Sequence, residues 1–170
     1  MNTNSIIGGS DGPTSIFVAG KMGADWINLF GLVIIVLLLI PNIIYAMKYK
    51  GVSNKCNNRA LNLIEQIGRY ASMFLMIFNI GIAEFGFSSV EAFIVYAIGN
   101  IVLIAAYWMV WLMFFIQPGF ARSMALAIIP TVIFLLNGIT LMHLFLIGSS
   151  IIFGIGHIYV TYQNAKEWKK

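Results

Sequence analysis

Long uncharged apolar stretches are the feature that most restricts how this chain can fold. Trp26–Met47 has no charged residue in 22 positions, Ala92–Ala121 has none in 30, and Ser123–Ala165 has none in 43 if its two histidines are neutral. A fourth stretch, Tyr70–Phe87, contains a single charge, Glu84. A helix needs about 20 apolar residues to cross the hydrocarbon layer of a membrane, which is roughly 30 Å thick. The pattern therefore predicts several membrane-spanning helices.

The amino-acid composition excludes an ordinary water-soluble domain. Charged residues make up 9% of the chain and hydrophobic residues 60%, whereas globular domains contain about 25% charged residues. We expect an all-α, polytopic integral membrane bundle that forms one membrane domain over residues 1–170, with the lipid bilayer as its first partner. The single cysteine, Cys56, cannot form an internal disulfide.

Turn signals divide the apolar stretches into spans. The stretch of 43 residues must hold two helices, because one helix of that length would be about 65 Å long. Asn137-Gly138 is the best turn signal within it, and Gln117-Pro118-Gly119 ends the helix before it. Five transmembrane helices are predicted, at Trp26–Met47, Ile67–Phe87, Val90–Ile116, Ala121–Leu136 and Ile139–Tyr162. A short interfacial helix is expected at Ala60–Arg69, and a half-helix or interfacial helix near the N-terminus.

The basic residues predict the orientation of these spans. With five spans, nine of the ten lysine and arginine residues fall on one side and only Lys21 on the other. Cytoplasmic loops of membrane proteins are enriched in these residues. We therefore expect a multi-pass protein of the cell (plasma) membrane, with residues 1–25 outside and the loop 48–66 and basic tail 163–170 in the cytoplasm. Because the cations belong to separate short loops, no nucleic-acid binding is expected.

The segment Ile6–Ala19 carries the most distinctive motif, with Asp11-Gly12-Pro13-Thr14 at its centre. These 14 residues resemble the glycine-aspartate-glycine-proline-threonine motif of the membrane β subunit of sodium-translocating decarboxylases. The resemblance implies that Asp11 is an ion-handling carboxylate for Na⁺ and that Gly12, Pro13 and Thr14 shape a break in a membrane helix. Transporters often place ion sites at such breaks. The alternative is that Asp11 or Gly12 caps a short helix, Pro13–Gly20, on the outer surface.

Three polar residues within the predicted spans complete the candidate ion or substrate site, which comprises Asp11, Gly12, Thr14, Glu84, Asn79 and Asn100. A charge inside the membrane costs about 2.5–3.5 kcal/mol even on insertion scales, so Glu84 is a functional candidate. It lies close enough to the span end to be an interfacial carboxylate instead. Asn79 and Asn100 lie on the second and third predicted spans.

A polar stripe follows helical spacing on the fifth predicted span and comprises His143, Ser150, Gly154 and His157. Small and hydroxyl-bearing residues allow close helix packing in membranes, so the stripe is either a packing surface or a water-lined or ligand-lined path. The two histidines are about 21 Å apart along a helix, so they cannot share a metal within one chain.

Two classes of function are favoured for such a chain, and intramembrane catalysis is a weaker third. The first is transport or handling of a cation such as sodium, and the second is a non-transporting accessory, assembly or scaffold subunit. Either could involve a homo-oligomer or a membrane partner subunit. The sequence shows no nucleophile–base pair, zinc spacing or dinucleotide motif, so we expect no enzyme, no catalytic residues, no metal centre and no cofactor other than Na⁺.

Overall fold

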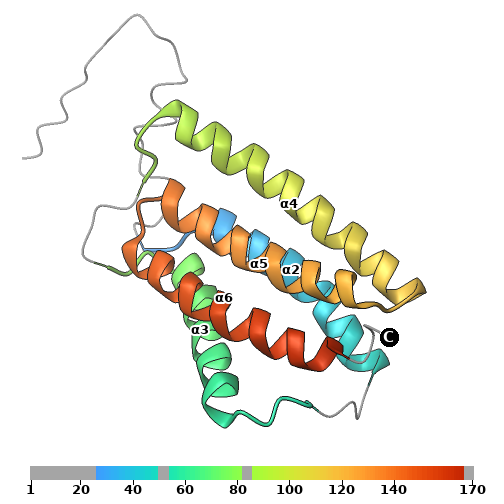
Figure 1. The fold of residues 1–170 in the computed structure, drawn as a ribbon. Coiled ribbons are helices and arrows are strands. Elements are labelled where there is room, and N and C mark those ends of the chain that lie inside the picture. The colour runs from blue at the N-terminus through green and yellow to red at the C-terminus, as the bar shows by residue number, and fades with distance from the viewer. Residues whose placement is uncertain (1–25, 50–53, 82–85, 167–170) are drawn as a thin grey trace, which may run out of the picture.

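The computed structural model describes residues 26–49, 54–81 and 86–166, and five helices form this part of the chain (Figure 1). The helices are α2 (Leu29–Lys48), α3 (Arg59–Ile77), α4 (Val90–Ile116), α5 (Phe120–Thr140) and α6 (Leu144–Ala165). The all-α prediction is confirmed. The N-terminal motif, the predicted N-terminal helix and the basic tail beyond Lys166 lie outside the described residues.

Much of the surface of the bundle is apolar, and several polar side chains lie in its interior beside the hydrophobic core. Large apolar residues such as Ile101 and Ile116 are exposed, whereas Ser72, Asn137 and Ser150 are fully buried. Exposed apolar area of this extent needs an explanation in a soluble protein. Four of the described helices, α2, α4, α5 and α6, are long and apolar enough to cross a membrane. The prediction of a membrane protein is therefore confirmed at this level.

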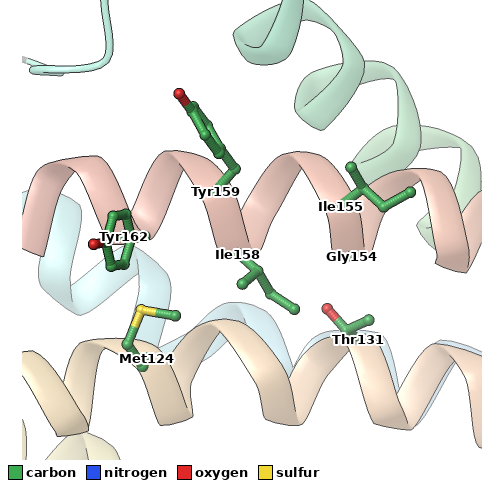
Figure 2. Close-up of a pocket in the computed structure, with 7 residues that line it drawn as sticks. All are labelled: Met124, Thr131, Gly154, Ile155, Ile158, Tyr159 and Tyr162. Atoms are coloured by element: carbon green, nitrogen blue, oxygen red, sulfur yellow. The ribbon is translucent and has the colours of Figure 1, made fainter.

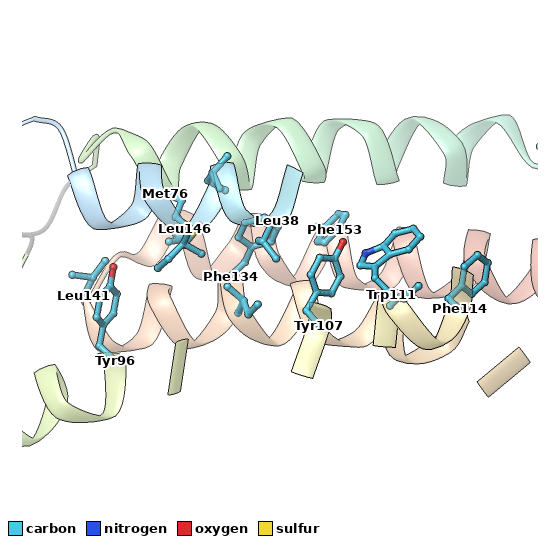
Figure 3. Packing of buried hydrophobic residues seen from close by; sticks show 14 residues of the cluster. Leu38, Met76, Tyr96, Tyr107, Trp111, Phe114, Phe134, Leu141, Leu146 and Phe153 are labelled. Carbon is cyan, nitrogen blue, oxygen red and sulfur yellow. The ribbon is translucent and has the colours of Figure 1, made fainter. Parts of the chain in front are cut away.

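The core runs along the length of the bundle, from Tyr96 and Leu141 at one end to Trp111 and Phe114 at the other (Figure 3). Helix α6 packs against both α3 and α5, α4 covers α5, and α2 contacts α3 and α4. Tyr107, near the middle of this row, is among the largest fully buried side chains.

Helices α2 and α3 run antiparallel and are joined at one end by the backbone. The N–H of Asn28 donates to the carbonyl of Ile77 at 2.7 Å, and the N–H of Asn79 donates to the carbonyl of Trp26 at 2.9 Å. We call this the far end of the bundle. At the other end, here called the basic end, α2, α4 and α6 finish and α3 and α5 begin. It carries Lys48, Lys55, Arg59, Arg122 and Lys166.

Helix α3 differs from the predicted arrangement. One continuous helix of 19 residues replaces the interfacial helix Ala60–Arg69 and the first half of the predicted span Ile67–Phe87. The predicted loop 48–66 contains its first turns. Asn58 starts the helix by accepting a hydrogen bond from the N–H of Leu61 at 3.2 Å. The helix ends at Ile77 because the backbone beyond it pairs with the segment before α2.

The predicted turn at Asn137-Gly138 is wrong, because α5 continues through it to Thr140. The side chain of Asn137 donates to the carbonyl of Ile133 at 2.7 Å, so its amide is used within the helix. Gly138 lies against α6, where an added Cβ would be 2.9 Å from Cγ1 of Ile147. Both residues therefore serve helix packing, and the predicted spans Ala121–Leu136 and Ile139–Tyr162 shift accordingly.

The actual turn between α5 and α6 is centred on Met142, whose φ of 54° is in the left-handed region. The N–H of Met142 donates to the carbonyl of Ile139 at 3.1 Å and the N–H of His143 donates to the carbonyl of Gly138 at 2.8 Å. These two bonds form a Schellman motif, which usually has glycine at the left-handed position. Met142 therefore occupies a position that glycine would favour.

We expect Met142→Gly to raise the free energy of unfolding by up to about 1 kcal/mol. The left-handed conformation costs a non-glycine residue roughly 1–2 kcal/mol, and the greater freedom of unfolded glycine offsets about 0.5–1 kcal/mol of that gain. Unfolding by a denaturing detergent would measure the change. Met109→Gly is the control, because this exposed position lies inside α4 and glycine there should destabilise. A loss of stability in both variants would contradict the prediction.

Candidate functional site

The predicted ion-site residues lie in three different settings. Asp11, Gly12, Thr14 and Glu84 fall outside the described residues. Asn79 follows α3 and is half-buried, with its backbone N–H bonded to Trp26.

Asn100 is buried in α4 and packs against α5. Its side-chain oxygen accepts a hydrogen bond from Nδ2 of Asn137 at 2.8 Å, and its own Nδ2 donates to the carbonyl of Tyr96 at 2.8 Å. The structure therefore brings Asn100 together with Asn137, a residue that sequence reasoning assigned to a turn.

All four residues of the predicted stripe lie against other parts of the bundle. His143 is buried at the start of α6, and the fully buried Ser150 donates to the carbonyl of Leu146. Gly154 lies against α5, where an added Cβ would be 2.5 Å from Cγ2 of Thr131. His157 faces α3, the helix that carries the charged cluster described next.

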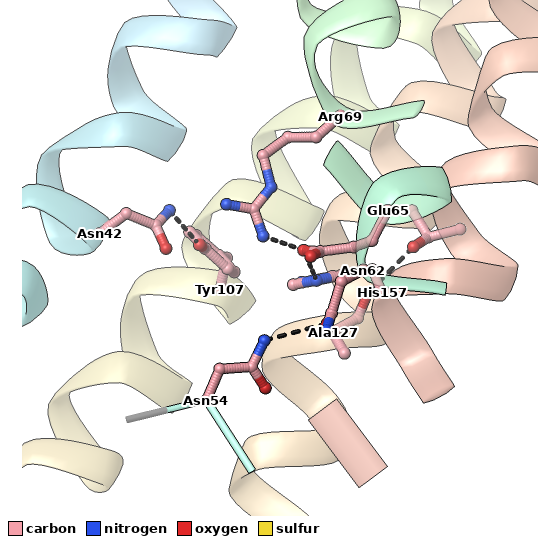
Figure 4. A network of polar contacts seen from close by, with 9 residues as sticks. Asn42, Asn54, Asn62, Glu65, Arg69, Tyr107, Ala127 and His157 are labelled. Carbon is pink, nitrogen blue, oxygen red and sulfur yellow. Dashed lines mark hydrogen bonds and ion pairs between the residues drawn. The ribbon is translucent and has the colours of Figure 1, made fainter. Parts of the chain in front are cut away.

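Glu65, Arg69 and His157 form a charged cluster between α3 and α6 (Figure 4). Nδ1 of His157 lies 3.0 Å from Oε1 of Glu65, and the guanidinium of Arg69 forms an ion pair with the same oxygen. The Glu65 side chain is 8% exposed, whereas that of Arg69 is 43% exposed. The His157 ring also stacks on Phe153, with 4.7 Å between ring centroids. The carboxylate is therefore enclosed, while the guanidinium remains accessible.

Two glycines bring the backbones of α3 and α6 together at this cluster. A Cβ added to Gly156 would lie 2.7 Å from the backbone N of Glu65, and one added to Gly68 would lie 2.6 Å from Cα of Phe153. The contact continues toward the far end, where Ser72 donates to Ser149 at 3.1 Å. Small residues of this kind allow close approach of helices in membranes. They hold the carboxylate of Glu65 next to the imidazole of His157.

The sequence contained a local signal for half of this cluster. Glu65 and Arg69 are four residues apart, a spacing that pairs opposite charges on one helix face. Gly68 and Ser72 follow at spacings of three and seven from Glu65, which places all four residues on neighbouring faces. The prediction missed this pattern because it placed Glu65 on a short interfacial helix in the cytoplasmic loop region, outside the bundle. No local signal links Glu65 to His157, which is 92 positions away.

The cluster forms part of the wall of a cavity of about 690 Å³ near the basic end. Ligand sites in proteins commonly have volumes of about 300–1,000 Å³. One side of the cavity is aromatic, with Tyr45, Tyr49, Trp111 and Phe114. The polar side chains come from several elements and comprise Asn42, Asn54, Lys55, Glu65, Arg69, Ser123, His157, Thr161 and Asn164. The cavity therefore combines a few charged groups with an apolar wall.

Hydrogen bonds fix several of the polar groups around the cavity. Nδ2 of Asn42 donates to the hydroxyl of Tyr107 at 2.8 Å and so links α2 to α4. The backbone N–H of Lys55 donates to Oδ1 of Asn164 at 2.8 Å and so ties the segment before α3 to the end of α6. Nδ2 of Asn54 donates to Oδ1 of Asn62 at 2.9 Å. These bonds, of which Figure 4 shows the first and third, connect the elements around the cavity.

A second hollow lies between α5 and α6 and has a different character (Figure 2). Its volume is about 460 Å³, and its lining residues are Met124, Thr131, Gly154, Ile155, Ile158, Tyr159 and Tyr162. None of these residues is charged. An apolar groove on an apolar surface is complementary to a lipid chain. The cavity lined by Glu65 and Arg69 is therefore the better candidate for binding a polar ligand. Within the described ranges, no group of three His, Cys, Asp or Glu residues could hold a metal ion.

Comparisons of the chain with known protein families, with curated proteins and with solved structures each gave no match. The likeness of Ile6–Ala19 to decarboxylase β subunits remains an expectation from the sequence. Function has to be inferred from the charged cluster and the cavity.

A buried titratable group at the far end is His143, in the connection between α5 and α6. Its Nδ1 accepts a hydrogen bond from the N–H of Leu146 at 3.3 Å, so a neutral imidazole caps the start of α6. Burial lowers the pKa of His143 below its ordinary value of 6.5, although hydrogen bonds to backbone groups such as that of Phe78 oppose the shift. Protonation would remove the cap acceptor and place a positive charge at a helix N-terminus, which is unfavourable.

We expect the protein to lose stability on acidification below pH 6.5, in part through His143. Because the folded-state pKa is lowered, the unfolded chain takes up the proton first, and stability falls by at most about 1.4 kcal/mol per pH unit for one group. His143→Asn keeps a capping oxygen but does not titrate. Its unfolding free energy between pH 5 and 8 should depend less on pH than that of the native chain. Identical pH profiles would contradict this role of His143.

Proposed function

We propose that this chain is a multi-pass membrane protein that transports or handles an ion or small charged solute through the cavity near its basic end. The observation that carries the proposal is the cluster of Glu65, Arg69 and His157 in the wall of that cavity. Ionisable groups inside a membrane bundle are costly and usually mark the path of an ion or substrate. A bundle held together only by packing has no need of three such groups beside a cavity.

The proposed topology has five spans, with α3 as the additional one. Its 19 residues make a helix about 28 Å long, and it runs antiparallel to both α2 and α6. The polar atoms of Glu65 and Arg69 face each other, and Glu65 also contacts His157 of α6, which supports passage of α3 through the membrane. The basic end would be cytoplasmic, because lysine and arginine are enriched on that side. In this orientation the N-terminus is outside and the C-terminus inside the cell membrane.

A transported or coupling cation is either a proton or sodium. Glu65 and His157 are within 3.0 Å of each other, and carboxylates paired with histidines commonly form proton relays in pumps and transporters. The sodium hypothesis rests on the N-terminal motif at Asp11, outside the described residues. The two ions can be separated by measuring each flux.

The test is flux in vesicles that contain the purified full-length chain. Proton entry would be followed with an internal pH dye under an imposed pH gradient, and sodium entry with radioactive sodium. We expect flux of one of these ions above that of protein-free vesicles, and its loss in Glu65→Gln. Glu91→Gln is the matched control, because Glu91 lies at the far end and is exposed. Flux equal to that of empty vesicles for both ions would contradict ion transport.

A second candidate function, an accessory or scaffold subunit, is supported by the weak burial of α4. Only 17% of its most apolar window is buried within the bundle, compared with 50% in α5. An apolar face of this size is free to contact lipid or another membrane chain. Disulfide cross-linking through Ile101→Cys, at a position that is 68% exposed, would detect a second chain on this face. Cross-linked protein that shows no flux would favour this function.

A further inference from the structure

We infer that the cavity near the basic end binds a small organic anion, with its carboxylate or phosphate group on Arg69 and its apolar part against Tyr45 and Trp111. The inference rests on the proposed function, since it names the class of solute that the same cavity would accept.

The charge that the cavity offers to a ligand is positive. Its charged lining residues are Lys55, Glu65 and Arg69. The carboxylate of Glu65 is enclosed and already contacts both Arg69 and His157. By contrast, 43% of the Arg69 side chain is exposed. A ligand that enters the cavity therefore meets a guanidinium rather than a carboxylate.

Arg69 has donors that remain for a ligand. A guanidinium carries five N–H donors, and within the described part of the chain Arg69 forms one hydrogen bond, to Glu65. Figure 4 shows the group between Glu65 and the pair formed by Asn42 and Tyr107. Because Glu65 is itself held by His157 on α6, its bond to Arg69 orients the guanidinium before the ligand arrives. The planar guanidinium matches the geometry of a carboxylate or phosphate.

The aromatic wall of the cavity favours a ligand that has an apolar part. Tyr45 of α2 and Trp111 of α4 have ring centroids 5.4 Å apart, and Phe114 lies 5.5 Å from Trp111. Together they form a continuous aromatic surface beside Arg69 in the same cavity. A cavity of 690 Å³ is also much larger than a water-sized ion, since a water molecule takes about 30 Å³. An inorganic anion would leave the aromatic wall without a contact.

The headgroup of an anionic lipid carries the same phosphate chemistry and reaches the membrane surface near this end. The experiment therefore separates the two sources. The full-length chain is placed in nanodiscs of phosphatidylcholine alone, and its melting temperature is measured with benzoate, phenyl phosphate, inorganic phosphate or benzylammonium. A parallel sample contains phosphatidylglycerol and no soluble anion. A ligand that binds the folded state raises the melting temperature, and above its dissociation constant the shift grows with the logarithm of the ligand concentration.

We expect benzoate and phenyl phosphate to raise the melting temperature increasingly with their concentration, inorganic phosphate to do so less at equal concentration, and benzylammonium to have no effect. Arg69→Gln should abolish the shift, whereas Arg69→Lys should retain part of it. Arg122→Gln should keep it in full, because Arg122 lies at the same end, outside the cavity lining, and bonds to Gln117. Stabilisation by benzylammonium, by phosphatidylglycerol alone, or equally in Arg69→Gln would overturn the inference.

Binding and flux are separate measurements, so the two proposals can fail independently. Anion binding through Arg69 in a protein that moves no ion contradicts transport and leaves the anion site intact. Ion flux that depends on Glu65, without any anion-induced shift, contradicts the anion site and leaves transport intact.

Discussion

Gly156→Val is expected to lower the free energy of unfolding by roughly 3 kcal/mol, at the upper end of the range for overpacked interiors. An added Cβ would lie 2.7 Å from the backbone N and 2.8 Å from Cα of Glu65. These are main-chain atoms, so the clash cannot be relieved by rotating a side chain. Helix α3 would have to move away from α6, which would also separate Glu65 from His157.

Gly148→Val provides the matched control for this variant. Gly148 lies on the same helix, two turns earlier, and an added Cβ there meets no atom within 4 Å. Its stability should change by less than about 1 kcal/mol, since substitutions away from packed contacts are usually mild. Both variants would be unfolded by titration with a denaturing detergent. Equal losses of stability at the two glycines would show that the α3–α6 contact is looser than the structure indicates.

The sequence predicted best those helices that are apolar on every side. The third predicted span, Val90–Ile116, has the bounds of α4, and the first, Trp26–Met47, differs from α2 by a few residues. Neighbouring residues in the sequence decide where these helices begin and end. Ser89 caps α4 by accepting a hydrogen bond from the N–H of Ala92 at 3.2 Å, and Gln117-Pro118-Gly119 follows the last turn of the helix. No distant contact is needed to place such ends.

Tertiary contacts explain where the prediction was wrong. Asn137 and Gly138 have the composition of a turn, yet Asn137 bonds to Asn100 of α4 and Gly138 packs on α6. Glu65 was placed on an interfacial helix in the cytoplasmic loop region, but α6 supplies a partner for it within the bundle. Neither contact has a pattern in the local sequence. The candidate site was missed for the same reason, since His157 and Glu65 meet only when α3 and α6 pack together.

Glu65→Ala is expected to lower the free energy of unfolding by about 2 kcal/mol, within the range for leaving a buried polar group without its hydrogen-bond partner. The change leaves the half-buried imidazole of His157 without its carboxylate partner. Arg69 contributes less to this loss because it is 43% exposed and can turn toward the cavity. Gln66→Ala is the control, since Gln66 is the neighbouring residue and is exposed; it should stay within about 0.5 kcal/mol of the native chain.

Double-mutant cycles would show which partner matters more to Glu65. The cycle with His157→Ala should give a coupling of about 1 kcal/mol, within the range for contacting residues. The cycle with Arg69→Ala should give a smaller coupling, because accessible ion pairs contribute about 0–1 kcal/mol. That order follows from the enclosure of the Glu65–His157 contact between the two helices. If the effects of Glu65→Ala and His157→Ala simply add, the two side chains do not interact in the folded protein, and the proton-relay form of the proposed function fails with them.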